Sequence, residues 1–183
     1  TEMAGLNDAG CIVFGQPDGL LPNLRVLMQA MRYASTFDFS VWLRPQEISL
    51  TNDGVAHDGE VATRLGLPTV PVCAETVALS NIILLTKETG VRVHLCRISS
   101  AEGLAMIRAA KQQGLPMTCD VTINHILLSD MDIGFFDSNC HLMPPLRSSG
   151  DRDALRNGLL DGTIDAICSD HAPVDEDAKL LPF

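Results

Sequence analysis

The chain is poor in aromatic residues, which make up 4% of its 183 residues, although hydrophobic residues of all kinds reach 46%. Its core must therefore be built from aliphatic side chains and methionine, a composition typical of packed α/β layers. Basic residues are also scarce, with 13 Lys and Arg against 23 Asp and Glu, and they form no basic run. The net charge of −10 argues against nucleic acid as a partner.

Long apolar runs, a secretory signal and paired cysteines are missing as well. The run 77–85 is broken by Ser80 and Asn81 and falls well short of the roughly 20 residues that a bilayer span needs. The first residues carry no basic segment followed by an apolar one, so we expect a cytoplasmic protein that does not enter a membrane. The six cysteines form no C-x-x-C pair and four lie in apolar, strand-like runs, which predicts reduced, buried thiols.

Short uncharged runs alternate along the chain with segments of helical period. The predicted strands are 11–14, 39–43, 91–96, 117–121 and 164–168, and the predicted helices are 21–33, 74–89, 151–160 and a helix that a capping box at 99–102 opens and Gly114 closes. Strands that alternate with helices predict a parallel sheet with right-handed crossovers.

Two parallel architectures compete, an open doubly wound sheet and a closed barrel. No G-x-G-x-x-G or G-x-x-x-x-G-K-[ST] sequence follows a predicted strand, so a nucleotide-binding open sheet loses its best support. The sequence therefore favours a (β/α)8 barrel, which has eight strands and about 250 residues. Five predicted strands indicate that about three βα units lie outside the chain.

Polar residues at the carboxyl ends of the predicted strands are the first candidates for a site, because parallel barrels build their sites there. They are Gln16, Asp18, Arg44, Gln46, Arg97, Asn124, His125, Asp170 and His171. The most specific is Asp170 in the sequence Ser-Asp-His-Ala-Pro, since a carboxylate at a strand end can hold a metal or accept a proton from water. The alternative is that Asp170 caps a following helix while His171 packs.

Several sequence blocks carry a family resemblance. They are 118–122, 125–128, 144–147 (Pro-Pro-Leu-Arg), 161–167, 169–173 and 181–183, with 59–61, 64–68 and 74–75 in addition. In their order and spacing these blocks closely resemble the bacterial dihydroorotases of the amidohydrolase superfamily, over essentially the whole chain. The resemblance implies a (β/α)8 barrel in which zinc activates a water to open or close the cyclic amide of dihydroorotate. Residues 1–183 would then form one partial barrel, approximately strands 4 to 8, without the N-terminal strands and a C-terminal extension.

The same resemblance implies that most metal ligands are replaced. Family members carry a His-x-His pair on the first strand, an Asp after the fourth, a His at the end of the fifth and of the sixth, and an Asp at the end of the eighth. By position the fourth-strand Asp falls at 16–17, with Asp18 one residue away; Arg44 and Arg97 replace the two histidines, and Asp170 is retained.

These replacements change the chemistry of the predicted site. A guanidinium has five N–H donors and no lone pair, and it stays protonated, so Arg44 and Arg97 would repel zinc. We therefore expect no metal cofactor, with Asp18 and Asp170 as the remnants of the metal site. Two substrate contacts of the family are also replaced, one by Met143 and one by Val174.

The other histidines have plain structural interpretations. His94 lies within a predicted strand, which favours a hydrogen-bonded core histidine over a metal ligand. His125 resembles a family histidine outside the metal ligands, which also favours a structural use. His57 and Asp58 lie in a polar stretch, which predicts a solvated loop.

Together, the resemblance and the replaced ligands predict a non-catalytic dihydroorotase-like protein of pyrimidine biosynthesis, a homo-oligomer that stabilises aspartate carbamoyltransferase. We expect Arg44 and Arg97 to pair with Asp170, because a buried carboxylate that has lost its cation needs another. The alternative is an active zinc-dependent dihydroorotase or related cyclic amidohydrolase that uses Asp170, His171 or Asp18, and the first-strand pair. A third hypothesis is a binding module whose two arginines hold a carboxylate such as orotate.

Overall fold

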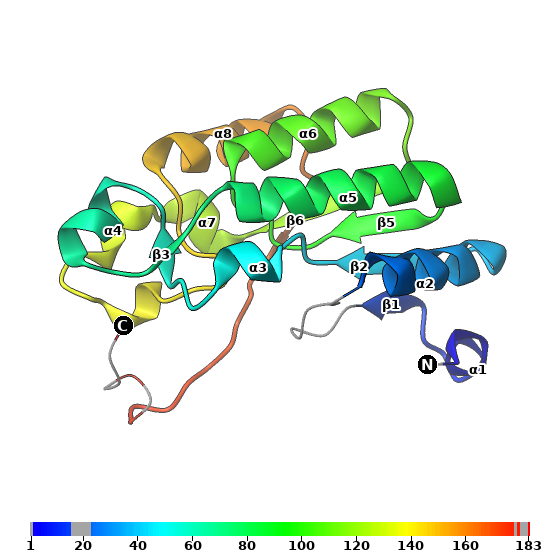
Figure 1. Ribbon diagram of the computed structural model, residues 1–183, viewed down its shortest axis with the longest axis horizontal. Coiled ribbons are helices and arrows are strands. Elements are labelled where there is room, and N and C mark those ends of the chain that lie inside the picture. Colours follow the sequence, from blue (N-terminus) through cyan, green and yellow to red (C-terminus); the bar gives the residue numbers. More distant parts are fainter. Residues whose placement is uncertain (1, 16–22, 178, 180–182) are drawn as a thin grey trace.

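The computed structural model describes residues 2–15, 23–177, 179 and 183. They form a parallel sheet with α5, α6 and α8 lying side by side over it (Figure 1). The strands are β1 (Val13–Gly15), β2 (Ser40–Leu43), β3 (Ala56–His57), β4 (Thr69–Val70), β5 (Arg92–Leu95), β6 (Met117–Thr122) and β7 (Ala166–Cys168). The helices are α1 (Met3–Asp8), α2 (Leu24–Thr36), α3 (Ile48–Thr51), α4 (Glu60–Leu65), α5 (Cys73–Thr89), α6 (Ala101–Gln112), α7 (Ile123–Leu127) and α8 (Ser149–Leu160), with 3-10 turns η1 (Asp130–Ile133) and η2 (Ser138–Cys140).

The main sheet has the order β1-β2-β5-β6-β7, and every neighbouring pair is parallel. The five predicted strands are therefore confirmed, with ends that shift by up to two residues. The register places Val41 opposite Val93 and Leu95 opposite Cys119. This arrangement brings the carboxyl ends of all five strands to one edge, where the predicted site residues follow.

The helix ends are fixed by local capping. Helix α5 ends at Gly90, whose φ of 68° is the left-handed conformation that glycine adopts readily. Helix α8 begins with a capping box formed by Ser148 and Asp151. The capping box predicted at 99–102 is wrong, because Ser100 is the N-cap and its side chain accepts from the Gly103 N–H. The first residues of the predicted helix 21–33 lie outside the described residues.

The two faces of the sheet differ because side chains alternate along each strand. Val41, Val93 and Val121 point toward the helices and are buried in the core. The residues between the core positions face the other way, and His94 and Asp120 are among them. Each buried aliphatic side chain stabilises the fold by about 1.5–3 kcal/mol. The helix-facing side therefore supplies packing, and the opposite side is left for polar chemistry.

A second small cluster lies beside the main sheet. Strand β3 pairs in parallel with β4, and Ala56, Ile133 and Leu146 are buried there. The solvated loop predicted at 57–58 is therefore wrong for His57, which is half-buried in β3, and holds for the exposed Asp58. A polar stretch can form a strand when its backbone pairs with a distant segment, which local patterning does not show.

All six cysteines are free thiols, as predicted, but their burial differs from the prediction. Only Cys119 and Cys140 are buried, and Cys11 and Cys73 are exposed. Cys11 precedes β1 and Cys73 is the first residue of α5, so neither lies inside a sheet. Within the described ranges, no helix combines the length and apolarity that crossing a membrane would require.

Candidate functional site at the carboxyl ends of the strands

Arg97 and Asp170 meet at the carboxyl edge of the sheet. Each lies two residues beyond its strand, β5 or β7, with a left-handed backbone of φ 59° and 49°. The Arg97 Nη1 donates to Asp170 Oδ1 at 3.0 Å, and the two side chains are 20% and 24% exposed. Among the described residues, Asp170 forms this ion pair with Arg97 and none with Arg44.

Three arginines surround a small cavity at the same edge. Its lining consists of Arg44, Pro45, Gln46, Val70, Ala74, Glu75, Arg97, Pro144, Pro145 and Arg147. The cavity volume is about 10 Å³, which holds about one water. In this conformation the cavity is too small for a cyclic amide.

Below this cavity lies a buried polar network that sequence reasoning missed. The Glu75 carboxylate accepts from the backbone N–H and the hydroxyl of both Ser99 and Ser100, at 2.5–3.1 Å. The buried Arg147 donates to Ser99 Oγ at 3.2 Å and to the Val70 carbonyl at 2.7 Å. The network joins α5, the loop after β5 and the Pro-Pro-Leu-Arg segment. The one available signal was an acidic residue in the apolar stretch that became α5.

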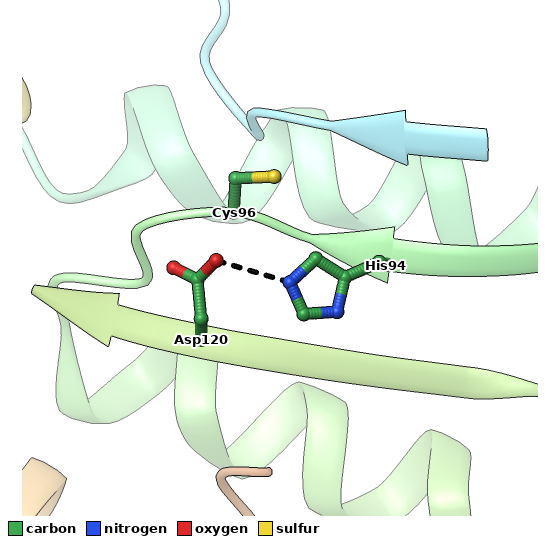
Figure 2. A group of neighbouring side chains, drawn as sticks. All are labelled: His94, Cys96 and Asp120. Atoms are coloured by element: carbon green, nitrogen blue, oxygen red, sulfur yellow. Dashed lines mark hydrogen bonds and ion pairs between the residues drawn. The ribbon is translucent and has the colours of Figure 1, made fainter. Parts of the chain in front are cut away.

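His94 and Asp120 form a buried pair on the face of the sheet opposite the helices. His94 Nε2 lies 3.0 Å from Asp120 Oδ2, and His94 Nδ1 lies 2.8 Å from Thr118 Oγ1. The Trp42 ring packs on the imidazole with centroids 4.5 Å apart. Both ring nitrogens have partners, in agreement with the predicted core histidine. Cys96, two residues further along the chain, lies beside this pair (Figure 2).

Burial and hydrogen bonds together set the protonation of Asp120 and its two neighbouring cysteines. Burial alone would raise the pKa of Asp120, but hydrogen bonds from His94 and from the Arg97 backbone N–H outweigh it and lower the pKa below its usual value. Burial and the nearby Asp120 carboxylate raise the pKa of the Cys96 thiol to about 11. The same two causes raise the pKa of Cys168 to about 12. The carboxylate is therefore ionised at neutral pH, and both thiols keep their protons.

His125 has a structural role in this fold. Its side chain is buried, with Nδ1 2.7 Å from Thr122 Oγ1 and Nε2 3.2 Å from the Pro145 carbonyl. Burial lowers the pKa of His125 to about 4. A neutral imidazole with both nitrogens bonded joins α7 to the Pro144-Pro145 segment, and its proton is held on Nε2 because a carbonyl can only accept.

The remaining candidates lie at the margin of the site. Met143 is 36% exposed and its sulfur accepts from Gln46 Nε2 at 3.2 Å, whereas Val174 is 61% exposed. His171 is exposed, and residues 171–177 form no helix, so the predicted capping role of Asp170 is wrong. Asp18 and residues 16–17 lie outside the described residues.

The residues at the histidine positions do not fit zinc. Zinc needs lone pairs from imidazole, thiolate or carboxylate. A guanidinium offers only N–H donors and a permanent positive charge, so neither Arg44 nor Arg97 can be a ligand. Asp170 is left as a single carboxylate among the described strand ends, and a guanidinium already occupies its Oδ1.

Comparisons with known proteins agree on one family. A family model described as Dihydro-orotase-like matches residues 1–103. A dihydroorotase-like protein of Pseudomonas putida is 44% identical over 182 residues, which cover 100% of this chain and 43% of that protein. A dihydroorotase of Bacillus caldolyticus is 41% identical over 173 residues, which cover 94% of this chain and 40% of that protein. The chain thus spans less than half the length of these relatives.

Solved structures share the fold. An L-hydantoinase of Arthrobacter aurescens superposes with a TM-score of 0.80 at 20% identity, covering 93% of this chain and 40% of that one. A dihydroorotase of Saccharomyces cerevisiae in complex with 5-fluoroorotic acid gives a TM-score of 0.74 at 15% identity, covering 98% and 50%. The five parallel strands are therefore part of a (β/α) barrel of this type.

Proposed function

From the premise that the chain belongs to the dihydroorotase-like family of the amidohydrolase superfamily, we propose that the whole protein is a non-catalytic member of that family. Its role is that of a structural subunit that stabilises aspartate carbamoyltransferase in the cytoplasmic synthesis of pyrimidines. The dihydroorotase-like relative of Pseudomonas putida supports the family, and the site chemistry supports the loss of catalysis.

The ion pair between Arg97 and Asp170 is the observation that carries the proposal. A catalytic aspartate at a strand end must bind the metal or accept a proton from water. Here its Oδ1 accepts from a guanidinium at 3.0 Å, and a guanidinium does not give up its proton at neutral pH. A site that cannot hold zinc leaves the pKa of water far above the value of about 7 that bound zinc would give it, so hydroxide attack at neutral pH is lost.

The side chains at two expected substrate contacts agree with this proposal. Met143 presents a thioether, which is a weak acceptor and no donor, and Val174 presents only methyl groups. Neither side chain can donate a hydrogen bond to a carboxylate or an amide. A cyclic amide would thus lose orientation as well as activation.

The fold itself is intact beneath the altered site. The helix-facing residues of all the central strands are buried against α2, α5 and α6, and none of that packing involves Arg97 or Asp170. A barrel can therefore persist after its reaction is lost, because function resides in the site and stability in the core. A folded, inactive barrel is suited to a role in assembly.

Turnover by the full-length protein tests the loss of catalysis. We expect no cyclisation of carbamoyl-aspartate, with or without added zinc, in an assay where an active dihydroorotase serves as the positive control. Turnover that disappears on Asp170→Asn would contradict the proposal. It would favour the alternative of an active zinc-dependent hydrolase, which the 41% identity to the Bacillus caldolyticus dihydroorotase supports.

Mixing with the aspartate carbamoyltransferase catalytic chain of the same organism tests the partner. We expect the two proteins to elute together from a sizing column and the transferase to lose activity more slowly on heating. The variant Asp170→Asn should assemble equally well, because the site chemistry plays no part in assembly. Separate elution and unchanged heat inactivation would contradict the structural role.

A further inference from the structure

The polar face of the sheet carries a group of potential metal ligands distinct from the strand-end residues. His94 lies on β5, Cys96 follows that strand directly, and Asp120 lies on β6. Figure 2 shows the His94 and Asp120 side chains between the two strands, with the Cys96 side chain near them on the β2 side of β5. We propose that His94, Cys96 and Asp120 bind a divalent transition-metal ion of the zinc type in the barrel interior, in a structural site separate from the Arg97–Asp170 pair.

The spacing of the donor atoms suits one ion. One ligand atom from each of the three residues lies within 4.8 Å of the others. Zinc bonds of about 2.0–2.3 Å place tetrahedral ligand atoms about 3.5 Å apart. His94 Nε2 and Asp120 Oδ2, at 3.0 Å, are already this close, so the Cys96 sulfur is the atom that must approach, by about 1 Å. Cys96 can make this movement by rotating about its Cα–Cβ bond, since no hydrogen bond of its thiol is found among the described residues. Imidazole, thiolate and carboxylate are all ligands that zinc takes.

Neighbouring groups already orient two of the ligands. Thr118 Oγ1 lies 2.8 Å from His94 Nδ1, and the Arg97 backbone N–H donates to Asp120 Oδ1 at 2.6 Å. Such outer hydrogen bonds fix the ring and the carboxylate in metal sites. The Trp42 ring packs on the imidazole and limits its rotation further. His94 and Asp120 therefore lose little conformational freedom on binding.

Protons and charge balance when the ion enters. His94 Nε2 must release its hydrogen bond to Asp120, and the ring proton moves to Nδ1, where the Thr118 hydroxyl changes from donor to acceptor. The Cys96 thiol loses its proton to solvent. One thiolate and one carboxylate then neutralise the charge of the divalent ion, so the buried site has no net charge. A water would complete four ligands and leave this charge balance unchanged.

The strand-end ion pair weakens the repulsion between Arg97 and a metal ion in the proposed site. The guanidinium of Arg97 is turned to Asp170 at 3.0 Å, while its backbone N–H faces Asp120. The positive charge of Arg97 is thus partly neutralised by a carboxylate outside the three ligands. The proposed metal site is compatible with an inactive barrel, because it uses neither Arg97 nor Asp170 as a ligand and leaves their ion pair in place.

Cobalt titration of the full-length protein, free of any affinity tag, tests the site. The protein is stripped with a chelator, kept in a non-thiol reductant and titrated with Co²⁺. We expect one equivalent per chain to give a thiolate-to-cobalt charge-transfer band in the near ultraviolet, which Zn²⁺ abolishes. Cys96→Ser should remove the band, and His94→Gln should weaken binding by more than about tenfold. Cys73→Ser, at an exposed cysteine of α5, is the matched control and should leave both unchanged.

A second measurement uses the unmodified protein. Zn²⁺ should slow alkylation of Cys96, mapped by mass spectrometry of its peptide, and should leave alkylation of Cys73 unchanged. The absence of both the band and this protection would overturn the site, as would a band that persists in Cys96→Ser. A catalytically active strand-end site would bind cobalt through imidazole and carboxylate without a thiolate band, so failure of the proposed function and failure of this site give different results.

Discussion

Replacing Arg97 with methionine, Asp170 with asparagine, and then both together measures how strongly the strand-end pair is coupled. Methionine keeps much of the length of the arginine side chain without its charge, and asparagine keeps the shape of aspartate. The double-mutant cycle isolates the interaction between the two side chains, because contacts that each makes with other residues cancel.

The expected coupling follows from the geometry. Two unit charges 3.0 Å apart attract by about 5 kcal/mol at an effective dielectric constant of about 20. Desolvation opposes this attraction, and the side chains keep 20% and 24% of their exposure, which adds solvent screening. A pair between the surface limit of about 0–1 kcal/mol and the buried limit of about 3–5 kcal/mol should couple by about 1–3 kcal/mol.

Urea unfolding of the full-length protein and its three variants is the assay. The double variant should lose less stability than the sum of the two single losses, by the coupling energy, and this coupling should fall with added salt. Arg32 and Glu88 are the matched control, since their ion pair has a similar distance of 3.1 Å but its side chains are 55% and 62% exposed. Equal coupling in the two pairs, or none at the strand ends, would refute the reasoning.

Three further predictions concern residues that hold the site in place. The pKa of His125 is about 4 in the folded protein and 6.5 in the unfolded chain, so between these pH values only the unfolded chain takes up the proton. The stabilising contribution of the neutral imidazole is therefore complete above pH 6.5. The free energy of unfolding should fall by up to about 3 kcal/mol as the pH drops to 4. Urea midpoints of His125→Gln should fall less over this range, and parallel pH curves would contradict the assignment. Glu75→Gln places an amide N–H group among four hydrogen-bond donors and should lower the free energy of unfolding, measured in urea, by about 2–4 kcal/mol. The exposed Glu88→Gln should lower it by less than about 0.5 kcal/mol. Similar losses in the two variants would argue against the network. In α8, a Cβ on Gly158 would lie 2.6 Å from a leucine side chain of α6, so Gly158→Ala should destabilise the protein by about 1–3 kcal/mol. A Cβ on Gly150 would have its nearest atom at 3.7 Å, so Gly150→Ala should be neutral or stabilise the protein by up to about 1 kcal/mol. Thermal midpoints that rank the two variants in the opposite order would contradict this packing.

The main sheet could be predicted because the sequence of each strand carries local signals of burial. Their runs carry almost no charge and alternate with amphipathic helices, and both signals lie within a few residues of the chain. The pair β3 and β4 escaped prediction because each strand has two residues and a polar neighbourhood. Their pairing depends on backbone contacts between 56–57 and 69–70, which no local period encodes.

The site was predictable as far as it depends on strand ends. The order of the strands brings Arg97 and Asp170 to one edge, and alternation along β5 and β6 places His94 and Asp120 on one face. The contacts of Glu75 depend on how α5 packs over the loop after β5, which the pattern of the helix alone does not fix. Helix packing sets such distances through shape complementarity, and that is a property of the assembled fold.

The left-handed backbone at Arg97 has a consequence for the history of such barrels. Its φ of 59° lies in a region that non-glycine residues seldom occupy, and histidine is one of the residues found there more often than most. The main chain at this position can therefore carry arginine or histidine with the same left-handed conformation. An exchange between histidine and arginine at this one position therefore needs no rebuilding of the loop around it.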